Sequence, residues 1–298
     1  MTTLADARRD VAATLRDAGV PSPDVDARWL VAAATGVDPR RTPGRPLDAA
    51  ARATLDVLVA RRAGREPLQR IVGTAPFRTL ELTCHPDVFV PRPETEVLVD
   101  LTLDLIDAVG PTADGPVVVH EPCCGSGAVG LALAVERDDL VVLQGDRSPA
   151  AVAATVGDRD RLAAAGRLRS TVHVHHGDLL AAFAAAAHPV PDVVVANPPY
   201  LPAADLGTLE PEVVDHDPHA ALVGGPDGHE LVDALLAAAA RRLRPGGGIA
   251  LEVDARRADE VAATATRAGY VDVTLRQDLT GADRFVVARR PGDGPPQR

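Results

Sequence analysis

From Val97 onward the chain repeats one order of elements: a helix, a short apolar strand, a loop and the next helix. The predicted strands are Val117–His120, Leu140–Leu143, Asp192–Ala196 and Ile249–Val253. Asp192–Ala196 is a continuous β-branched run without the polar alternation of a strand that has one solvated face. Such strands, alternating with helices, are typical of a parallel sheet that is covered on both faces. Val271–Leu275 and Phe285–Ala288 predict a terminal antiparallel hairpin. The predicted fold class is therefore α/β, with a doubly wound, Rossmann-like sheet.

The residues before this pattern predict a different structure. Apolar residues recur at helical spacing between Leu4 and Val59, and glycines and prolines separate the helical stretches. We expect a small helical domain over residues 1–75, a β-hairpin linker over 76–92, the α/β domain over 93–291 and a disordered polar tail over 292–298.

A glycine-rich loop follows the first strand of the α/β domain, and Asp146 stands at the end of the next strand, 21 residues after Gly125. The spacing Gly125-x-Gly127-x-x-Gly130 fits a dinucleotide fingerprint, and it also fits an S-adenosylmethionine site in which Asp146 holds the ribose hydroxyls. Four residues separate the strand from Gly125, whereas a dinucleotide loop places its first glycine at the strand end. The spacing favours the methyl-donor site.

The only asparagine of the chain lies in Asn197-Pro198-Pro199-Tyr200, directly after a buried strand. An Asn-Pro pair alone is also typical of a turn. Ligands of such sheets bind beyond the carboxyl ends of the strands, however, and two prolines make a stiff loop that presents carbonyl oxygens. The Asn197 oxygen and the Pro198 carbonyl can accept both hydrogens of a planar NH₂ group, while Tyr200 offers a ring face. This arrangement predicts N-methylation by positioning, with the acceptors and the ring stabilising the positive charge that develops on nitrogen.

Together these motifs resemble the protein-(glutamine-N5) methyltransferases that modify class I peptide release factors. The resemblance runs over nearly the whole chain, and its most specific stretches are Arg65–Gly73, Val90–Glu96 and Asn197–Tyr200. Shorter matches are Asp146–Pro149, Gly177–Leu180, Arg244–Gly247 and Gly281–Arg284. The resemblance implies a class I S-adenosylmethionine-dependent methyltransferase fold with an N-terminal helical domain that clasps the protein substrate.

The resemblance also implies residue roles. Asn197, Pro198 and Tyr200 would be catalytic, and Asn197, Pro198, Pro199 and Tyr200 would bind the substrate. The cofactor would contact Glu121, Cys123, Cys124, Gly125, Ser126, Gly127, Asp146, Asp178, Leu179 and Asn197. The implied reaction is S-adenosylmethionine-dependent N5-methylation of the glutamine in the Gly-Gly-Gln motif of a release factor, a step that serves translation termination in the cytoplasm. The implied enzyme is a monomer that uses no metal.

Several positions depart from the family pattern and indicate a divergent branch. Cys123 stands where the family has the first glycine of its loop, and Glu121 replaces an aspartate. Asp217-Pro218-His219 stands in place of Glu-Pro-Arg, and Arg70 in place of a tyrosine. The segment around Glu94 and Glu96 is expected to have a structural role and to shape the substrate cleft.

Charge and composition bear on the substrate class. The net charge is −11, whereas a protein that grips duplex DNA needs a basic face. An acidic protein suits a partner with a basic surface. One alternative stays open: methylation of an exocyclic amine of adenine or guanine in DNA or RNA, with Asn197 and Tyr200 acting on a flipped base. A degenerate cofactor-binding module is a second alternative, which the intact Asn197–Tyr200 motif opposes.

The remaining signals predict ordinary structural roles. No apolar run is long enough to span a membrane, and the N-terminus lacks the order of a signal peptide. We expect Cys123 and Cys124 to be small buried loop residues, and His173 and His175 to be polar residues of an edge strand rather than metal ligands. His216, Asp217 and His219 are expected in a solvated loop.

Overall fold

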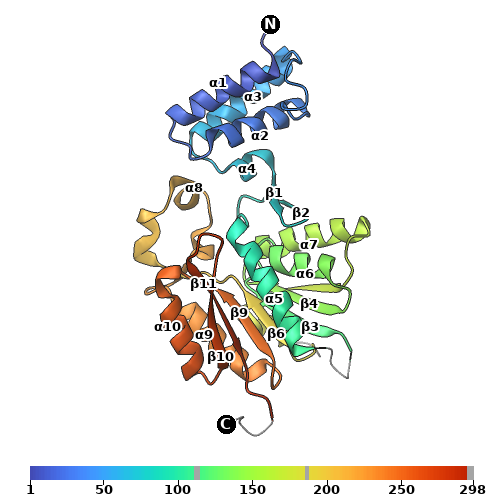
Figure 1. The fold of residues 1–298 in the computed structure, drawn as a ribbon, viewed down its shortest axis with the longest axis vertical. Coiled ribbons are helices and arrows are strands. Elements are labelled where there is room, and N and C mark those ends of the chain that lie inside the picture. The colour runs from blue at the N-terminus through green and yellow to red at the C-terminus, as the bar shows by residue number, and fades with distance from the viewer. Residues whose placement is uncertain (111–114, 185–187, 294–298) are drawn as a thin grey trace. The chain divides into compact units, whose positions relative to one another are not determined.

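A computed structural model describes residues 1–110, 115–184 and 188–293, and the chain forms two compact units (Figure 1). The helical unit comprises Met1–Thr74 and Leu209–His216, and the sheet unit comprises Ala75–Thr208 and Asp217–Arg298. Most of the predicted C-terminal tail, residues 294–298, lies outside the described residues. No helix within the described ranges is long and apolar enough to cross a membrane.

The helical unit consists of α1 (Leu4–Asp17), α2 (Pro23–Thr35), α3 (Ala49–Ala63), α4 (Leu68–Val72) and α8 (Pro211–Val214). Local signals set the helix ends. Thr3 and Asp6 form a reciprocal capping box at the start of α1, and Gly36 ends α2 with a φ of 73°. Apolar side chains of α1 to α4 form one core, which includes Leu4, Leu15, Leu30, Leu55 and Ile71.

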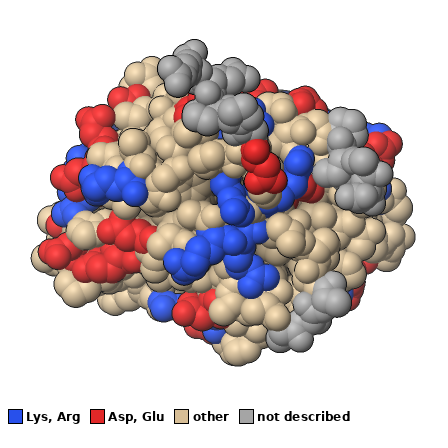
Figure 2. All heavy atoms as spheres, turned by 90° about the horizontal axis from the view of Figure 1, so that it is seen from below, with Lys and Arg blue, Asp and Glu red and all other residues tan. Residues whose placement is uncertain are grey.

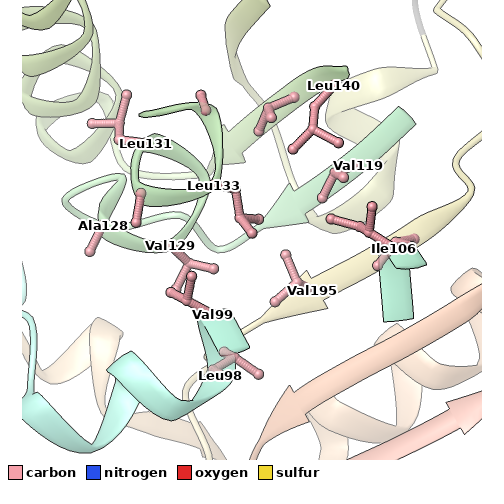
Figure 3. Close-up of a cluster of buried hydrophobic side chains, with 14 of the residues drawn as sticks. Leu98, Val99, Ile106, Val119, Ala128, Val129, Leu131, Leu133, Leu140 and Val195 are labelled. Carbon is pink, nitrogen blue, oxygen red and sulfur yellow. The ribbon is translucent and has the colours of Figure 1, made fainter. Parts of the chain in front are cut away.

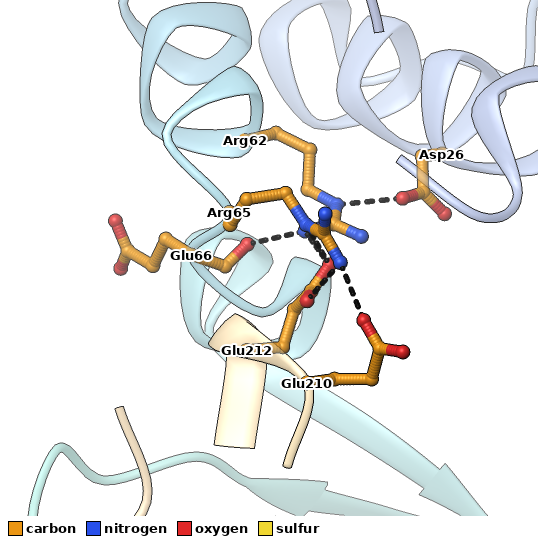
Figure 4. Close-up of polar contacts among 6 residues, drawn as sticks. All are labelled: Asp26, Arg62, Arg65, Glu66, Glu210 and Glu212. Carbon is orange, nitrogen blue, oxygen red and sulfur yellow. Dashed lines mark hydrogen bonds and ion pairs between the residues drawn. The ribbon is translucent and has the colours of Figure 1, made fainter. Parts of the chain in front are cut away.

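A cluster of ion pairs joins residues 209–216 to the rest of the helical unit (Figure 4). The Arg62 side chain is only 7% exposed; its Nε donates to Asp26 at 2.7 Å and its Nη1 donates to Glu212 at 3.0 Å. Arg65 forms a two-bond pair with Glu212, at 2.7 and 2.6 Å, and also contacts Glu210. A buried charge is tolerated only when it is paired. Glu212 therefore provides a second carboxylate partner for the buried Arg62 guanidinium.

The sheet unit contains a seven-stranded sheet in the order β10-β11-β9-β6-β3-β4-β5. The strands are β3 (Val117–Pro122), β4 (Leu140–Asp146), β5 (Thr171–His176), β6 (Val193–Ala196), β9 (Gly248–Glu252), β10 (Val271–Gln277) and β11 (Asp283–Arg289). Strands β5, β4, β3, β6 and β9 pair in parallel, while β11 pairs antiparallel with both β9 and β10. The predicted parallel sheet with a closing antiparallel hairpin is confirmed.

Two helical layers cover this sheet. One core contains buried residues of α5 (Glu96–Val109), α6 (Ala128–Glu136) and α7 (Pro149–Ala164), and the other contains residues of α9 (Glu230–Arg242) and α10 (Ala258–Arg267). Strand β6 contributes Val193 and Val195 to the first core, shown in Figure 3, and Val194 and Ala196 to the second. This two-sided burial explains why the strand reads as an unbroken apolar run.

Two small sheets complete the unit. Strands β1 (Thr74–Phe77) and β2 (Leu80–Thr83) form a hairpin that overlaps only the first part of the predicted 76–92 linker, and its two-residue loop places Arg78 at a φ of 51°. The Thr83 N–H donates to Asp158 of α7 at 2.8 Å, which fixes the hairpin to the main sheet's helices. The second sheet pairs β7 (Leu201–Pro202) in parallel with β8 (Val223–Gly225). The described residues also contain 3₁₀ segments at Pro93–Thr95, Leu179–Phe183, Ala203–Thr208, His219–Ala221 and Ala255–Arg257.

Candidate active site

A cavity of the sheet unit is lined by residues that follow the carboxyl ends of β3, β4, β5 and β6. The strand order runs outward in both directions from β3 and β6, which makes this the switch point where open α/β sheets bind ligands. Every predicted site residue except Gly127 lines the cavity: Glu121, Cys123, Cys124, Gly125, Ser126, Asp146, Asp178, Leu179, Asn197, Pro198, Pro199 and Tyr200.

Asp146 ties two backbone segments of the cavity together. Its carboxylate accepts from the Gly125 N–H at 2.9 Å and from the Ser148 N–H at 2.8 Å. Gly127 lies beneath the loop and has a φ of 77°; a Cβ added there would come within 2.6 Å of the Thr155 side chain. Gly127 therefore shapes the loop through packing.

Cys123 and Cys124 are loop residues with neutral thiols. Burial raises the pKa of Cys123 to about 12 and raises that of Cys124 well above its usual range, so neither is a thiolate at neutral pH. Cys123 has a φ of 61°, the left-handed conformation that glycine adopts without strain. Among the described residues, no group of three or more histidine, cysteine, aspartate or glutamate side chains is placed to hold a metal ion.

Glu121 both lines the cavity and supports the helix that follows it. Its Oε2 accepts from the Gly130 N–H at 2.9 Å and from Gln144 Nε2 at 2.6 Å, and burial raises its pKa to about 8. A Cβ at Gly130 would lie 2.5 Å from this oxygen, so the third glycine of the motif makes room for the carboxylate.

The Asn197–Tyr200 loop is held rigidly. The Leu201 N–H donates to the Leu222 carbonyl at 2.9 Å, which joins the end of the loop to the start of the small sheet. Cβ atoms added at Gly224 or Gly228 would come within 2.5 Å of the Pro199 carbonyl or 2.7 Å of the Tyr200 carbonyl, respectively. The loop is therefore closely packed against neighbouring backbone at both Pro199 and Tyr200.

Two residues outside the predicted site form a hydrogen-bond chain with Asn197. Its Nδ2 donates to Thr95 Oγ1 at 3.2 Å, and the Thr95 hydroxyl donates to Glu252 Oε2 at 2.7 Å. Glu252 is 2% exposed, and burial raises its pKa to about 7. Burial also raises the pKa of Tyr200, beside Glu252, so its phenol stays protonated.

The motifs contained a partial signal for these residues. Thr95 lies in the Val90–Glu96 match, but Glu252 ends an apolar strand and carries no motif of its own.

The loop after the Asn197–Tyr200 motif differs from its prediction at one residue. Asp217 was expected in a solvated loop, yet its residue exposure is 4% because it pairs with Arg92. Arg92 in turn stacks on Phe89, with its guanidinium 4.7 Å from the ring centroid. His219 is exposed, and His216 is partly buried. His173 and His175 lie on edge strand β5, as predicted.

Known proteins match this chain over nearly its full length. The family model described as PrmC N-terminal domain matches residues 6–73. The release factor glutamine methyltransferase of Mycolicibacterium smegmatis is 42% identical over 298 residues, which cover 97% of this chain and 99% of that protein. The protein of the same name from Streptomyces coelicolor is 40% identical, with coverages of 93% and 94%.

Solved structures share the fold. A methyltransferase from Pyrococcus furiosus matches with a TM-score of 0.51 and 18% identity, covering 72% of this chain and 90% of that one. The hMettl16 catalytic domain, solved in complex with an RNA hairpin, matches with a TM-score of 0.55 and 13% identity, covering 78% and 81%. At these identities the likeness shows a methyltransferase fold alone.

Proposed function

The chain belongs to the release factor glutamine methyltransferase family, and from this premise we propose that it methylates the N5 atom of the glutamine in the Gly-Gly-Gln motif of a class I peptide release factor. The observation that carries the proposal is the rigid Asn197–Tyr200 loop at the cavity, within a chain that matches the family from end to end. We further propose that the enzyme acts as a monomer in the cytoplasm and serves translation termination.

The cavity suits S-adenosylmethionine. Asp146 and Asp178 bring two carboxylates to the lining, which can accept from hydroxyl and amine donors, and a Cβ at Gly125 would meet nothing within 4 Å, so the loop leaves open space. When bound, this cofactor supplies the methyl group. Asp146 would hold the ribose, Asp178 would face the adenine, and the loop with Glu121 would hold the methionine part.

The chain's own contribution is to position the substrate amide. An amide nitrogen is a poor nucleophile because its lone pair is delocalised. The Asn197 oxygen and the Pro198 carbonyl would accept its two hydrogens and turn its lone pair toward the methyl group, with the Tyr200 ring against the amide plane. The same groups would stabilise positive charge on the nitrogen in the transition state.

Mass spectrometry tests the proposal. Purified release factors are incubated with the enzyme and S-adenosylmethionine, and we expect one added methyl on the glutamine of Gly-Gly-Gln, formed roughly 10²- to 10³-fold more slowly with Asn197→Ala. A methylated glutamine in another protein alone would keep the chemistry and discard the partner. Methyl groups found only on adenine or guanine would discard both.

A further inference from the structure

We propose that Thr95 and Glu252 form a positioning pair that sets the orientation of the Asn197 amide for the methyl transfer. The inference rests on the proposed function, because it assigns a task to the Asn197 oxygen. It gives roles to a residue of the Val90–Glu96 segment and to the last residue of β9, which lie 157 positions apart in the chain.

Hydrogen-bond donation fixes the direction of the pair. A threonine hydroxyl has one hydrogen, and Thr95 donates it to Glu252 Oε2 at 2.7 Å. Thr95 Oγ1 can then only accept from its other neighbour, so the NH₂ end of the Asn197 side chain must face it, at 3.2 Å. This leaves the Asn197 oxygen for the substrate. The flipped amide would present N–H groups to the NH₂ of the substrate, where no hydrogen bond can form.

The surroundings make the pair rigid. Thr95 is 4% exposed and Glu252 is 2% exposed, so water cannot replace either partner freely. Strand β9 pairs with β6, which ends one residue before Asn197, and the Thr95 segment begins helix α5. The two hydrogen bonds of Thr95 thus connect the start of α5, the end of β9 and the loop after β6.

Protonation of Glu252 would reverse the direction of its hydrogen bond with Thr95. A protonated carboxyl donates to Thr95 Oγ1, which frees the Thr95 hydrogen to bond the Asn197 oxygen. The charged and titratable groups around Glu252 act in opposite senses: Glu94 disfavours its ionised form, while Arg284 of β11 and the Tyr200 hydroxyl favour that form. Arg284 is itself paired with Asp278 at 2.7 Å. With its pKa raised to about 7 by burial, Glu252 takes up a proton close to neutral pH, so turnover should fall as the pH drops through this range.

Kinetics of four variants provide the first test. Thr95→Val removes the hydroxyl and should lower kcat by roughly 10- to 100-fold, with KM and S-adenosylhomocysteine affinity within about threefold. Thr95→Ser should restore most of kcat. A glutamine side chain has one acceptor oxygen and one NH₂ group, so in Glu252→Gln it cannot accept hydrogen bonds at both ends as the carboxylate does. This variant should behave like Thr95→Val. The matched control is Thr102→Val, because Thr102 is a buried threonine of α5 that bonds only the Leu98 carbonyl among the hydrogen bonds described, and this variant should be neutral.

Coupling and pH dependence distinguish positioning from general stability. The double variant of Thr95→Val and Glu252→Gln should lose no more than either single variant, because both break one pathway. The fall of kcat at low pH should be present in the parent enzyme and absent from both single variants. Additive losses, or an unchanged acid limb in the variants, would overturn the proposal.

A spectroscopic test does not depend on the substrate. The chain has one asparagine, so ¹⁵N-asparagine labelling gives a single side-chain NH₂ signal. Its shift should titrate with a midpoint near pH 7 in the parent protein, and the titration should vanish in Thr95→Val and Glu252→Gln but persist in Thr102→Val. If release factors are not methylated while the signal titrates as expected, the proposed function fails and the positioning pair stands. If the NH₂ signal changes neither with pH nor in Thr95→Val, the proposed role of Thr95 and Glu252 is wrong, whatever the substrate is.

Discussion

Asn197 concentrates the proposed chemistry in one side chain, since its two ends have different tasks. Its Nδ2 is bonded to Thr95, and its oxygen is left for the substrate. We expect Asn197→Ala to lower kcat by roughly 10² to 10³, the usual loss for one transition-state hydrogen bond, while cofactor affinity stays within several-fold. Calorimetry with S-adenosylhomocysteine and single-turnover kinetics separate the two effects. Near-normal turnover of this variant would contradict the role given to Asn197.

Cys123 occupies a backbone conformation that its side chain disfavours, with a φ of 61°. Left-handed backbone costs a non-glycine residue about 1–2 kcal/mol, while glycine costs about 0.5–1 kcal/mol in unfolded-state entropy. Cys123→Gly relieves this strain but also removes a buried side chain, so its free energy of unfolding should stay within about 1 kcal/mol of the parent's. Gly125→Ala, at a φ of 55°, should lose about 1–2 kcal/mol under the same urea titration. The reverse order would show that this strain is negligible.

His120 makes stability depend on pH. Burial, and next the nearby Arg242, lower its folded-state pKa to about 3, against about 6.5 in the unfolded chain. The unfolded state therefore binds the proton more readily: the contribution is complete above pH 6.5 and is lost as the pH falls toward 3. Relative to His120→Phe, the parent should lose up to about 1.4 kcal/mol per pH unit below 6.5. His173→Phe, at an exposed position, is the control, and parallel pH curves for all three proteins would refute the prediction.

At the scale of elements, the sequence predicts best what is local. Strand β6 and its following loop were recognised because valine runs, prolines and the single asparagine are adjacent in the chain. The Thr95–Glu252 bond and the Glu212–Arg62 pair were missed, because each joins residues about 150 positions apart and leaves no periodic trace. From the sequence alone, a glutamate in a loop is expected to be solvated. Only the folded structure shows that Glu212 forms an ion pair with the buried Arg62.

Helix α2 offers a matched comparison of a buried and an exposed ion pair. Asp26 pairs with buried Arg62, whereas Asp24, two positions away, pairs with Arg16 where both side chains are more than half exposed. Asp26→Ala should cost about 1–3 kcal/mol, because the buried Arg62 Nε loses its acceptor while Nη1 keeps Glu212. Asp24→Ala should cost less than about 1 kcal/mol. Urea unfolding followed by the fluorescence of Trp29, the only tryptophan, reports on this unit; equal losses would contradict the assignment.

At the scale of the whole molecule, charge is unevenly distributed. Figure 2 shows arginine side chains gathered near the centre of one face, although the net charge is −11. Elsewhere in the sheet unit, two arginines donate to backbone carbonyls, Arg289 to Gly246 and Arg290 to Leu243. We therefore expect no retention on a heparin column at about 0.15 M salt and firm retention on an anion exchanger at pH 8. Strong heparin binding would favour a nucleic-acid substrate after all.

The helical unit is built from two stretches of chain, and this has a consequence for its synthesis. Residues 1–74 leave the ribosome about 140 residues ahead of Glu212. At roughly 5–20 residues per second, this delay lasts about 7 to 28 seconds. During that interval Arg62 has Asp26 and the Glu66 carbonyl but lacks Glu212. The helical unit is thus completed only after the Asn197–Tyr200 loop has been translated, so this part of the chain cannot finish folding in the order of its sequence.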